Sequence, residues 1–130
     1  MTTLYLRRGL SVVAAMLLGL LVVTAHAEPS NKWRIKLNHR ADNEGTIVLR
    51  VAPIDGTAID VETKVPANTG ENHIAKLIRD ALKATLGEGY HVETDDGEDV
   101  LIKKRKDTPN FDLTLVSTSV TGVTIKLKRE

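Results

Sequence analysis

Residues 69–87 of the chain read TGENHIAKLIRDALKATLG, and this stretch decides how the rest of the sequence is organised. Its apolar side chains recur every three or four residues, which places them on one stripe of a helix with a period of about 3.6 residues. The stripe consists of Ile74, Leu77, Ile78, Ala81, Leu82 and Leu86. Asn68 with Glu71 three residues later is a typical helix start, Asn72 is a competing cap, and Gly87 can end the helix. The pattern predicts one amphipathic helix with a face to bury.

The segments on both sides of this helix alternate between apolar and polar side chains, as strands with one buried face do. We expect strands at residues 33–40, 47–51 and 59–65, then at 90–95, from 100 onward, at 111–115 and at 123–127. The first two are expected to pair as a hairpin, and Asp96-Gly97 is a turn signal after the fourth. Alternation favours antiparallel pairing. The sequence therefore predicts an α+β fold: a single antiparallel sheet of about seven short strands with one amphipathic helix packed on one face.

Residues 1–27 have the organisation of a bacterial secretory signal peptide. Arg7 and Arg8 precede an uncharged apolar run at residues 9–23, and Ala25-His26-Ala27 is a small-x-small cleavage pattern. The apolar run is short for a permanent anchor, which needs about 20 residues, although an uncleaved anchor is the alternative. We expect a cleaved signal peptide at 1–27, a single small α+β domain at 28–130, no permanent membrane span after cleavage, and a periplasmic or secreted location.

Composition excludes several classes of function. The chain has no cysteine, which rules out disulfides, thiolate metal sites and thiol catalysis. Its formal net charge is +1, and removing two arginines with the signal leaves a nearly neutral domain, so we expect no nucleic-acid partner. Neither a nucleophile elbow nor a glycine-rich phosphate loop is present. These observations predict a protein without a catalytic site or cofactor.

Two polar features invite a metal interpretation, and neither has ligand spacing. The histidines of the domain, His39, His73 and His91, are too far apart in sequence for a helical or tight-turn zinc pair. His39 is in phase with the apolar side of the first strand and is expected to be partly buried. The acidic segment 95–99 contains a glycine but lacks the ligand spacing of a calcium loop, and it fits a hairpin turn better. No metal site is therefore predicted.

The basic run Lys103, Lys104, Arg105 and Lys106 is the sharpest local feature and the candidate binding site for an anionic partner. Two explanations remain open for it. Cationic side chains on an edge strand prevent unwanted pairing with other chains. Alternatively, the run binds an anionic component of the cell envelope, such as lipopolysaccharide or an acidic glycan, or an acidic protein surface.

A family resemblance covers residues 59–127. It is carried by a strand, the helix with Ile74 and Ile78, the segment Tyr90-His91-Val92-Glu93, the Asp96-Gly97 turn, and the strand NFDLTL at 110–115. This order resembles the small ββαββ modules inserted in bacterial flagellins and phage tail proteins. The resemblance implies a structural or surface-display role without catalysis, although the long helical arms of flagellins are missing here.

These features together predict an exported, non-enzymatic surface-binding module of the cell envelope or extracellular space, whose partner is an unknown protein or an anionic envelope component. One alternative is a structural subunit that assembles through strand edges. Another is an inhibitor of an exported enzyme that presents the loop at residues 41–45 or the loop at 117–122. The oligomeric state is left open.

Overall fold

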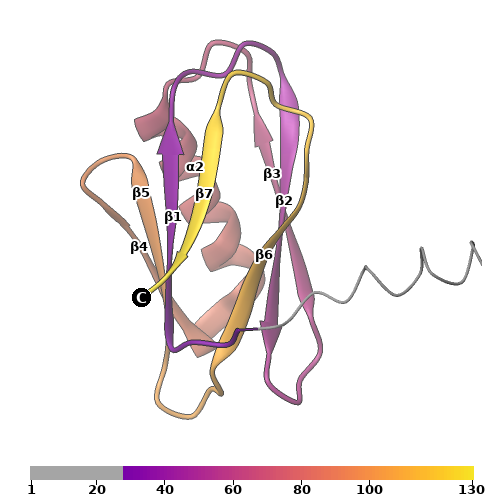
Figure 1. Ribbon diagram of the computed structural model, residues 1–130, viewed down its shortest axis with the longest axis vertical. Coiled ribbons are helices and arrows are strands. Elements are labelled where there is room, and N and C mark those ends of the chain that lie inside the picture. The colour runs from indigo at the N-terminus through magenta and orange to yellow at the C-terminus, as the bar shows by residue number, and fades with distance from the viewer. Residues whose placement is uncertain (1–27) are drawn as a thin grey trace, which may run out of the picture.

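The computed structural model describes residues 28–130, so the predicted signal peptide at residues 1–27 lies outside the described residues. The described chain folds into one α-helix and seven strands (Figure 1). The elements in order are β1 (Lys32–Asn38), β2 (Gly45–Pro53), β3 (Ile59–Val65), α2 (Glu71–Leu86), the 3-10 turn η1 (Gly87–Gly89), β4 (Tyr90–Asp95), β5 (Asp99–Lys104), β6 (Phe111–Thr118) and β7 (Thr124–Arg129). The α+β class and the single helix are confirmed for these residues. No helix among them is long and apolar enough to cross a membrane.

The strands form two antiparallel sheets, and the prediction of a single sheet is wrong. One sheet has the order β4-β5-β1-β7 and the other β3-β2-β6. The expected hairpin of the first two strands does not exist, because β1 pairs with β5 and β7 whereas β2 pairs with β3 and β6. The physical reason is that alternation fixes which face of a strand is buried but leaves its neighbours open. The connector at residues 39–44 carries the chain from one sheet to the other.

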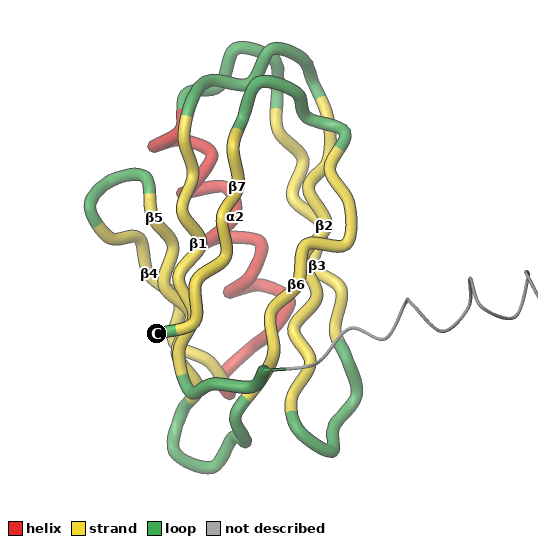
Figure 2. The backbone as a smooth tube through the Cα atoms, viewed as in Figure 1, coloured by secondary structure: helices red, strands yellow, loops and turns green. Residues whose placement is uncertain are grey.

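Helix α2 packs against both sheets on one side of the domain (Figure 2). Its buried side chains are Ile74, Ala75, Ile78 and Leu82, and it contacts the edge strands β3 and β4. The predicted helix and its end at Gly87, where φ is +70°, are confirmed. The expected capping by Asn68 or Asn72 is wrong, because Gly70 is the N-cap residue and no side chain caps the helix. Asn68 instead adopts a left-handed turn conformation.

Phe111 joins the two halves of the core. Its side chain is fully buried, and its ring meets Tyr90 edge-on at a centroid distance of 5.2 Å. Its carbonyl oxygen accepts a hydrogen bond from the indole Nε1 of Trp33 at 2.9 Å. Because Phe111 belongs to β6 and its two partners belong to β1 and β4, these contacts tie the three-stranded sheet to the four-stranded one.

Candidate functional site

The outer face of the four-stranded sheet carries basic side chains opposite one another on neighbouring strands. β1 places one such residue on every second position, and the antiparallel registers set each beside a basic residue of β5 or β7. The directly opposed pairs are Lys32 with Lys103, Arg34 with Lys128, and Lys36 with Lys126. We call these six residues the basic face.

Such an arrangement works against stability. Like charges that lie directly opposite in a sheet are destabilising, whereas opposite charges contribute roughly 0.2–1 kcal/mol per pair. None of the ion pairs in residues 28–130 involves a lysine of the basic face. Four of its lysines, at positions 36, 103, 126 and 128, are exposed, and Lys32 is half-buried. The five ammonium groups are therefore available to a ligand and partly repel one another.

Arg34 differs from these lysines because acidic side chains surround it. Its Nη1 donates to Asp99 Oδ2 at 2.8 Å and to Asp95 Oδ2 at 2.9 Å, and its Nε donates to Glu130 Oε1 at 2.6 Å. The hydrogen bond to Glu130, then those to Asp99 and Asp95, hold the pKa of Arg34 above its usual range. The nearby carboxylates are thus used on one guanidinium, and the lysines around it remain unpaired.

The cluster makes stability depend on pH in a defined direction. Arg34, and secondarily Lys128 and Lys32, lower the pKa of Glu130 below its ordinary value of 4.5. A carboxyl group with a lowered pKa in the folded state stabilises the fold above its unfolded pKa, and this contribution is lost as the pH falls through the folded pKa. We expect Glu130→Gln to lower the free energy of unfolding at neutral pH, with the difference from the parent shrinking in acid below that pKa.

Urea unfolding of the parent and of Glu130→Gln at neutral pH and in acid measures this difference. The matched control is Glu62→Gln, because Glu62 is exposed on β3 and forms no ion pair in the described chain. A destabilisation by Glu130→Gln that is equally large in acid would show that the charge of Glu130 is not what matters.

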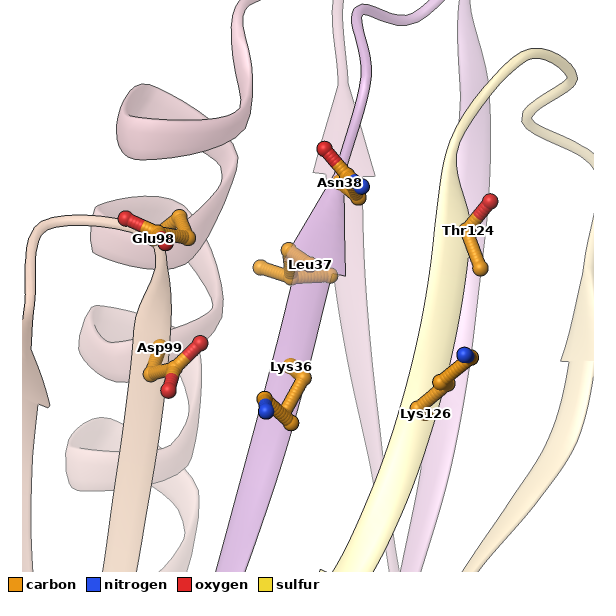
Figure 3. A pocket seen from close by; sticks show the side chains of 7 residues that line it. All are labelled: Lys36, Leu37, Asn38, Glu98, Asp99, Thr124 and Lys126. Atoms are coloured by element: carbon orange, nitrogen blue, oxygen red, sulfur yellow. The ribbon is translucent and has the colours of Figure 1, made fainter.

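A hollow of about 320 Å³ opens beside the basic face where β5, β1 and β7 run together (Figure 3). Lys36 lies between Asp99 on one neighbouring strand and Lys126 on the other. The lining residues are Lys36, Leu37, Asn38, Glu98, Asp99, Thr124 and Lys126. Asp99 is engaged by Arg34, whereas the ammonium groups of Lys36 and Lys126 and the carboxylate of Glu98 form no ion pair in residues 28–130. The hollow is lined mainly by polar and charged side chains, and its two free lysines lie on the side that belongs to the basic face.

The structure separates the members of the predicted basic run. Lys103 belongs to the basic face, whereas Lys104 is half-buried on the other side of β5, and Arg105 and Lys106 lie exposed in the turn that follows. Arg105 lines another hollow with Lys83 and His91 near the end of the helix. β5 pairs with β1 and β4, so it is not an edge strand, and edge protection does not explain the run.

The other polar features stay apart from this face. His39 is exposed with φ of +72°, which corrects the expectation that it is partly buried, and it lies just after β1. In residues 28–130 no cluster of potential metal ligands occurs. The two loops considered for inhibition are tied together, since Asn43 Nδ2 donates to the carbonyl of Ser119 and Asn43 Oδ1 accepts from the amide of Thr121.

Sequence reasoning missed most of the basic face. The sequence does contain the pattern behind it: basic residues alternate with apolar residues in KWRIKLN at 32–38 and in TIKLKR at 124–129. Each segment alone indicates only a strand with a wet face. The two segments form one surface only because β1 pairs with β7, which brings residues 33–38 beside residues 124–129.

No protein-family model matches the chain, and no curated protein matches its sequence. The resemblance to the modules of flagellins and phage tail proteins therefore stays a prediction. The segment on which it was based, residues 59–127, is divided between the sheets, with β3 and β6 in one and β4, β5 and β7 in the other. Function is therefore inferred from the side chains of the basic face.

Proposed function

We propose that the chain is an exported, non-enzymatic binding module that holds a linear anionic polymer, such as an acidic glycan of the cell envelope, on its basic face. The observation that supports this most is the set of three like-charge pairs across β1, β5 and β7. Charge repulsion of this kind lowers stability and is typical of surfaces shaped by binding. A ligand with closely spaced anionic groups relieves the repulsion.

The geometry of the face favours a polymer over a lipid bilayer. Neighbouring strands are about 4.8 Å apart, and alternate residues along a strand are about 6.8 Å apart, so the cations form a regular grid. The exposed large apolar residues in the described chain are Ile54, Leu115 and Val116, and none lies on this sheet. A surface with cations and no apolar side chains to insert matches a solvated, repeating anion rather than a membrane interface.

Neutralising the central cations of the face tests the proposal. We expect Lys32→Gln/Lys36→Gln/Lys103→Gln to bind heparin and polygalacturonate about tenfold to a hundredfold more weakly, because each exposed ion contact contributes roughly 0.2–1 kcal/mol. Its salt dependence should also be shallower, since fewer counterions are released on binding. The variant should be about as stable as the parent, because its substitutions remove two like-charge pairs, Lys32 with Lys103 and Lys36 with Lys126.

Isothermal titration calorimetry at several salt concentrations, with urea unfolding alongside, measures both properties. The matched control is Lys64→Gln/Lys76→Gln/Lys83→Gln, which removes the same charge from β3 and from the helix. Equal weakening by the two variants would reduce the effect to net charge and contradict the proposal. Retention on anionic phosphatidylglycerol vesicles without polymer binding would assign the face to a membrane instead.

The predicted basic run can be resolved by single substitutions. Lys103→Gln should weaken polymer binding, because Lys103 belongs to the basic face and is the cross-strand neighbour of Lys32. Lys106→Gln should leave binding unchanged, because Lys106 lies in the turn beyond β5. Both side chains are exposed and both changes remove one charge, so they are a matched pair. The reverse order of effects would move the binding site to the turn.

A further inference from the structure

The two outer edges of the four-stranded sheet have opposite charge on its outer face. At one edge β7 carries Lys126 and Lys128 there, and at the other edge β4 carries Glu93 and Asp95. Neither strand has a second strand partner, because β7 pairs only with β1 and β4 only with β5 in the described chain. Edge strands with unpaired backbone groups pair readily with another strand unless charge or shape forbids it.

We infer that a second copy of this chain adds its β4 to β7 of the first, so that the four-stranded sheets of successive copies form one continuous sheet. This goes beyond polymer binding and uses the sheet edges rather than the centre of the basic face. Three antiparallel pairings separate β4 from β7, so the two strands run in opposite directions within one sheet. A copy displaced sideways along the sheet therefore presents β4 antiparallel to β7.

The same displacement brings opposite charges together. Within the sheet Glu93, Leu101, Arg34 and Lys128 form one row across the four strands, and Asp95, Asp99, Lys36 and Lys126 form the next. Keeping these rows aligned between copies places Lys128 opposite Glu93 of the next copy and Lys126 opposite Asp95 of the next copy. The side chains of Glu93 and Asp95 are 55% and 41% exposed, so both can be reached.

The backbone groups match in this register as well. The amide of Glu130 donates to Lys32 at 3.0 Å, so the backbone groups of alternate residues, Leu127 and Arg129, point to the free edge of β7. The amide of Arg105 donates to the carbonyl of Gly89 at 2.9 Å, so those of Val92 and Thr94 point to the free edge of β4. The aligned rows set Leu127 against Thr94 and Arg129 against Val92. All four residues then face a partner with unpaired donors and acceptors.

Self-pairing of β7 with β7 is disfavoured by the same lysines. An antiparallel pair that keeps both outer faces on one side sets Lys126 against Lys126 or Lys128 of the other copy, which repel. The contact is consequently between two different edges, and each copy keeps one free edge of each kind. Such a heterologous contact, when it repeats the sideways displacement described above, does not close into a ring and produces open chains of molecules.

Charge reversal with rescue tests this contact. Sedimentation velocity up to about 1 mM, a range that includes weak interfaces of small area, should show species larger than a dimer for the mature parent. Lys128→Glu alone and Glu93→Lys alone should each shift the protein to monomer, and the double variant Lys128→Glu/Glu93→Lys should recover assembly. The control Lys76→Glu changes the same charge on the helix and should assemble like the parent.

The absence of cysteine from the sequence permits a second test that does not depend on affinity. In the aligned register Glu93 and Lys128 of adjacent copies form a non-hydrogen-bonded pair with a Cα separation of about 4.5 Å, which suits a disulfide. Oxidised Glu93→Cys/Lys128→Cys should form a ladder of covalent oligomers, whereas His73→Cys/Lys128→Cys should not. A parent that stays monomeric at every concentration, or a rescue variant that fails to assemble while remaining folded by circular dichroism, would overturn the inference. Loss of polymer binding with assembly intact would instead count against the proposed function alone.

Discussion

Replacing Phe111 by alanine should lower the free energy of unfolding by about 3–5 kcal/mol, the range for removing a fully buried aromatic side chain. The ring of Phe111 is completely inaccessible to solvent and packs edge-on against Tyr90. Its loss leaves a cavity at the junction of β6 with the four-stranded sheet, where the surrounding backbone is fixed by hydrogen bonds to Ser30 and cannot collapse freely. Urea unfolding followed by tryptophan fluorescence measures the change, because Trp33 is the single tryptophan of the chain.

Leu115→Ala is the matched control for this substitution. Leu115 lies on the same strand and the same side of β6, but its side chain is 36% exposed, so its truncation should cost considerably less than that of Phe111. Similar losses for both variants would mean that Phe111 does not hold the sheets together. A stable Phe111→Ala protein would contradict the placement of the core.

Replacing Arg34 by alanine should lower the free energy of unfolding by about 2–4 kcal/mol at neutral pH, because hydrogen bonds to charged groups are strong and their removal leaves partner charges stranded. Arg34 is the only cation within 4.0 Å of Asp99 in the described chain, and the side chain of Asp99 is only 8% exposed. The variant also leaves Asp95 and Asp99 close to each other. Part of the loss should disappear in acid, because the contribution of Glu130, whose pKa Arg34 lowers, is lost from the parent as the pH falls through that lowered pKa.

The control for Arg34 is Arg50→Ala. Arg50 also donates to a carboxylate, with Nε 2.7 Å from Asp60 Oδ1, but both side chains are about half exposed at 46% and 45%. Exposed pairs contribute little because water screens them. Thermal unfolding at neutral pH should therefore show a clear loss for Arg34→Ala and a small one for Arg50→Ala. Equal losses would show that the three-carboxylate cluster is no stronger than an ordinary surface pair.

The elements of the fold could be predicted from the sequence because their signals are local. The stripe that includes Ile74, Ile78 and Leu82 determines the helix, and the alternation at residues 59–65 and 90–95 matches β3 and β4 in full. The Asp96-Gly97 signal also corresponds to a turn in which both residues have positive φ. Each of these patterns depends on neighbours within a few residues, which is the range that propensity and periodicity describe.

Strand pairing could not be predicted in the same way. This explains why the sequence suggested one sheet instead of two and why most of the basic face was missed. Trp33, Ile35 and Leu37 show that β1 buries one face, yet the same pattern fits a partner in either sheet. The basic face follows from that pairing, since Lys126 becomes a neighbour of Lys36 only when β7 returns beside β1. A run such as residues 103–106 is visible in sequence, whereas a surface assembled from three strands is not.

The central claim is tested most directly by a nuclear magnetic resonance titration of the domain at residues 28–130 with short heparin oligosaccharides. If the basic face binds an anionic polymer, backbone amide shifts should concentrate on β1, β5 and β7, with the largest changes around Lys32, Lys36 and Lys103, and they should fade as salt is raised. Shifts confined to β6, to the helix or to the turn at residues 105–108, or no shifts at low salt, would contradict it.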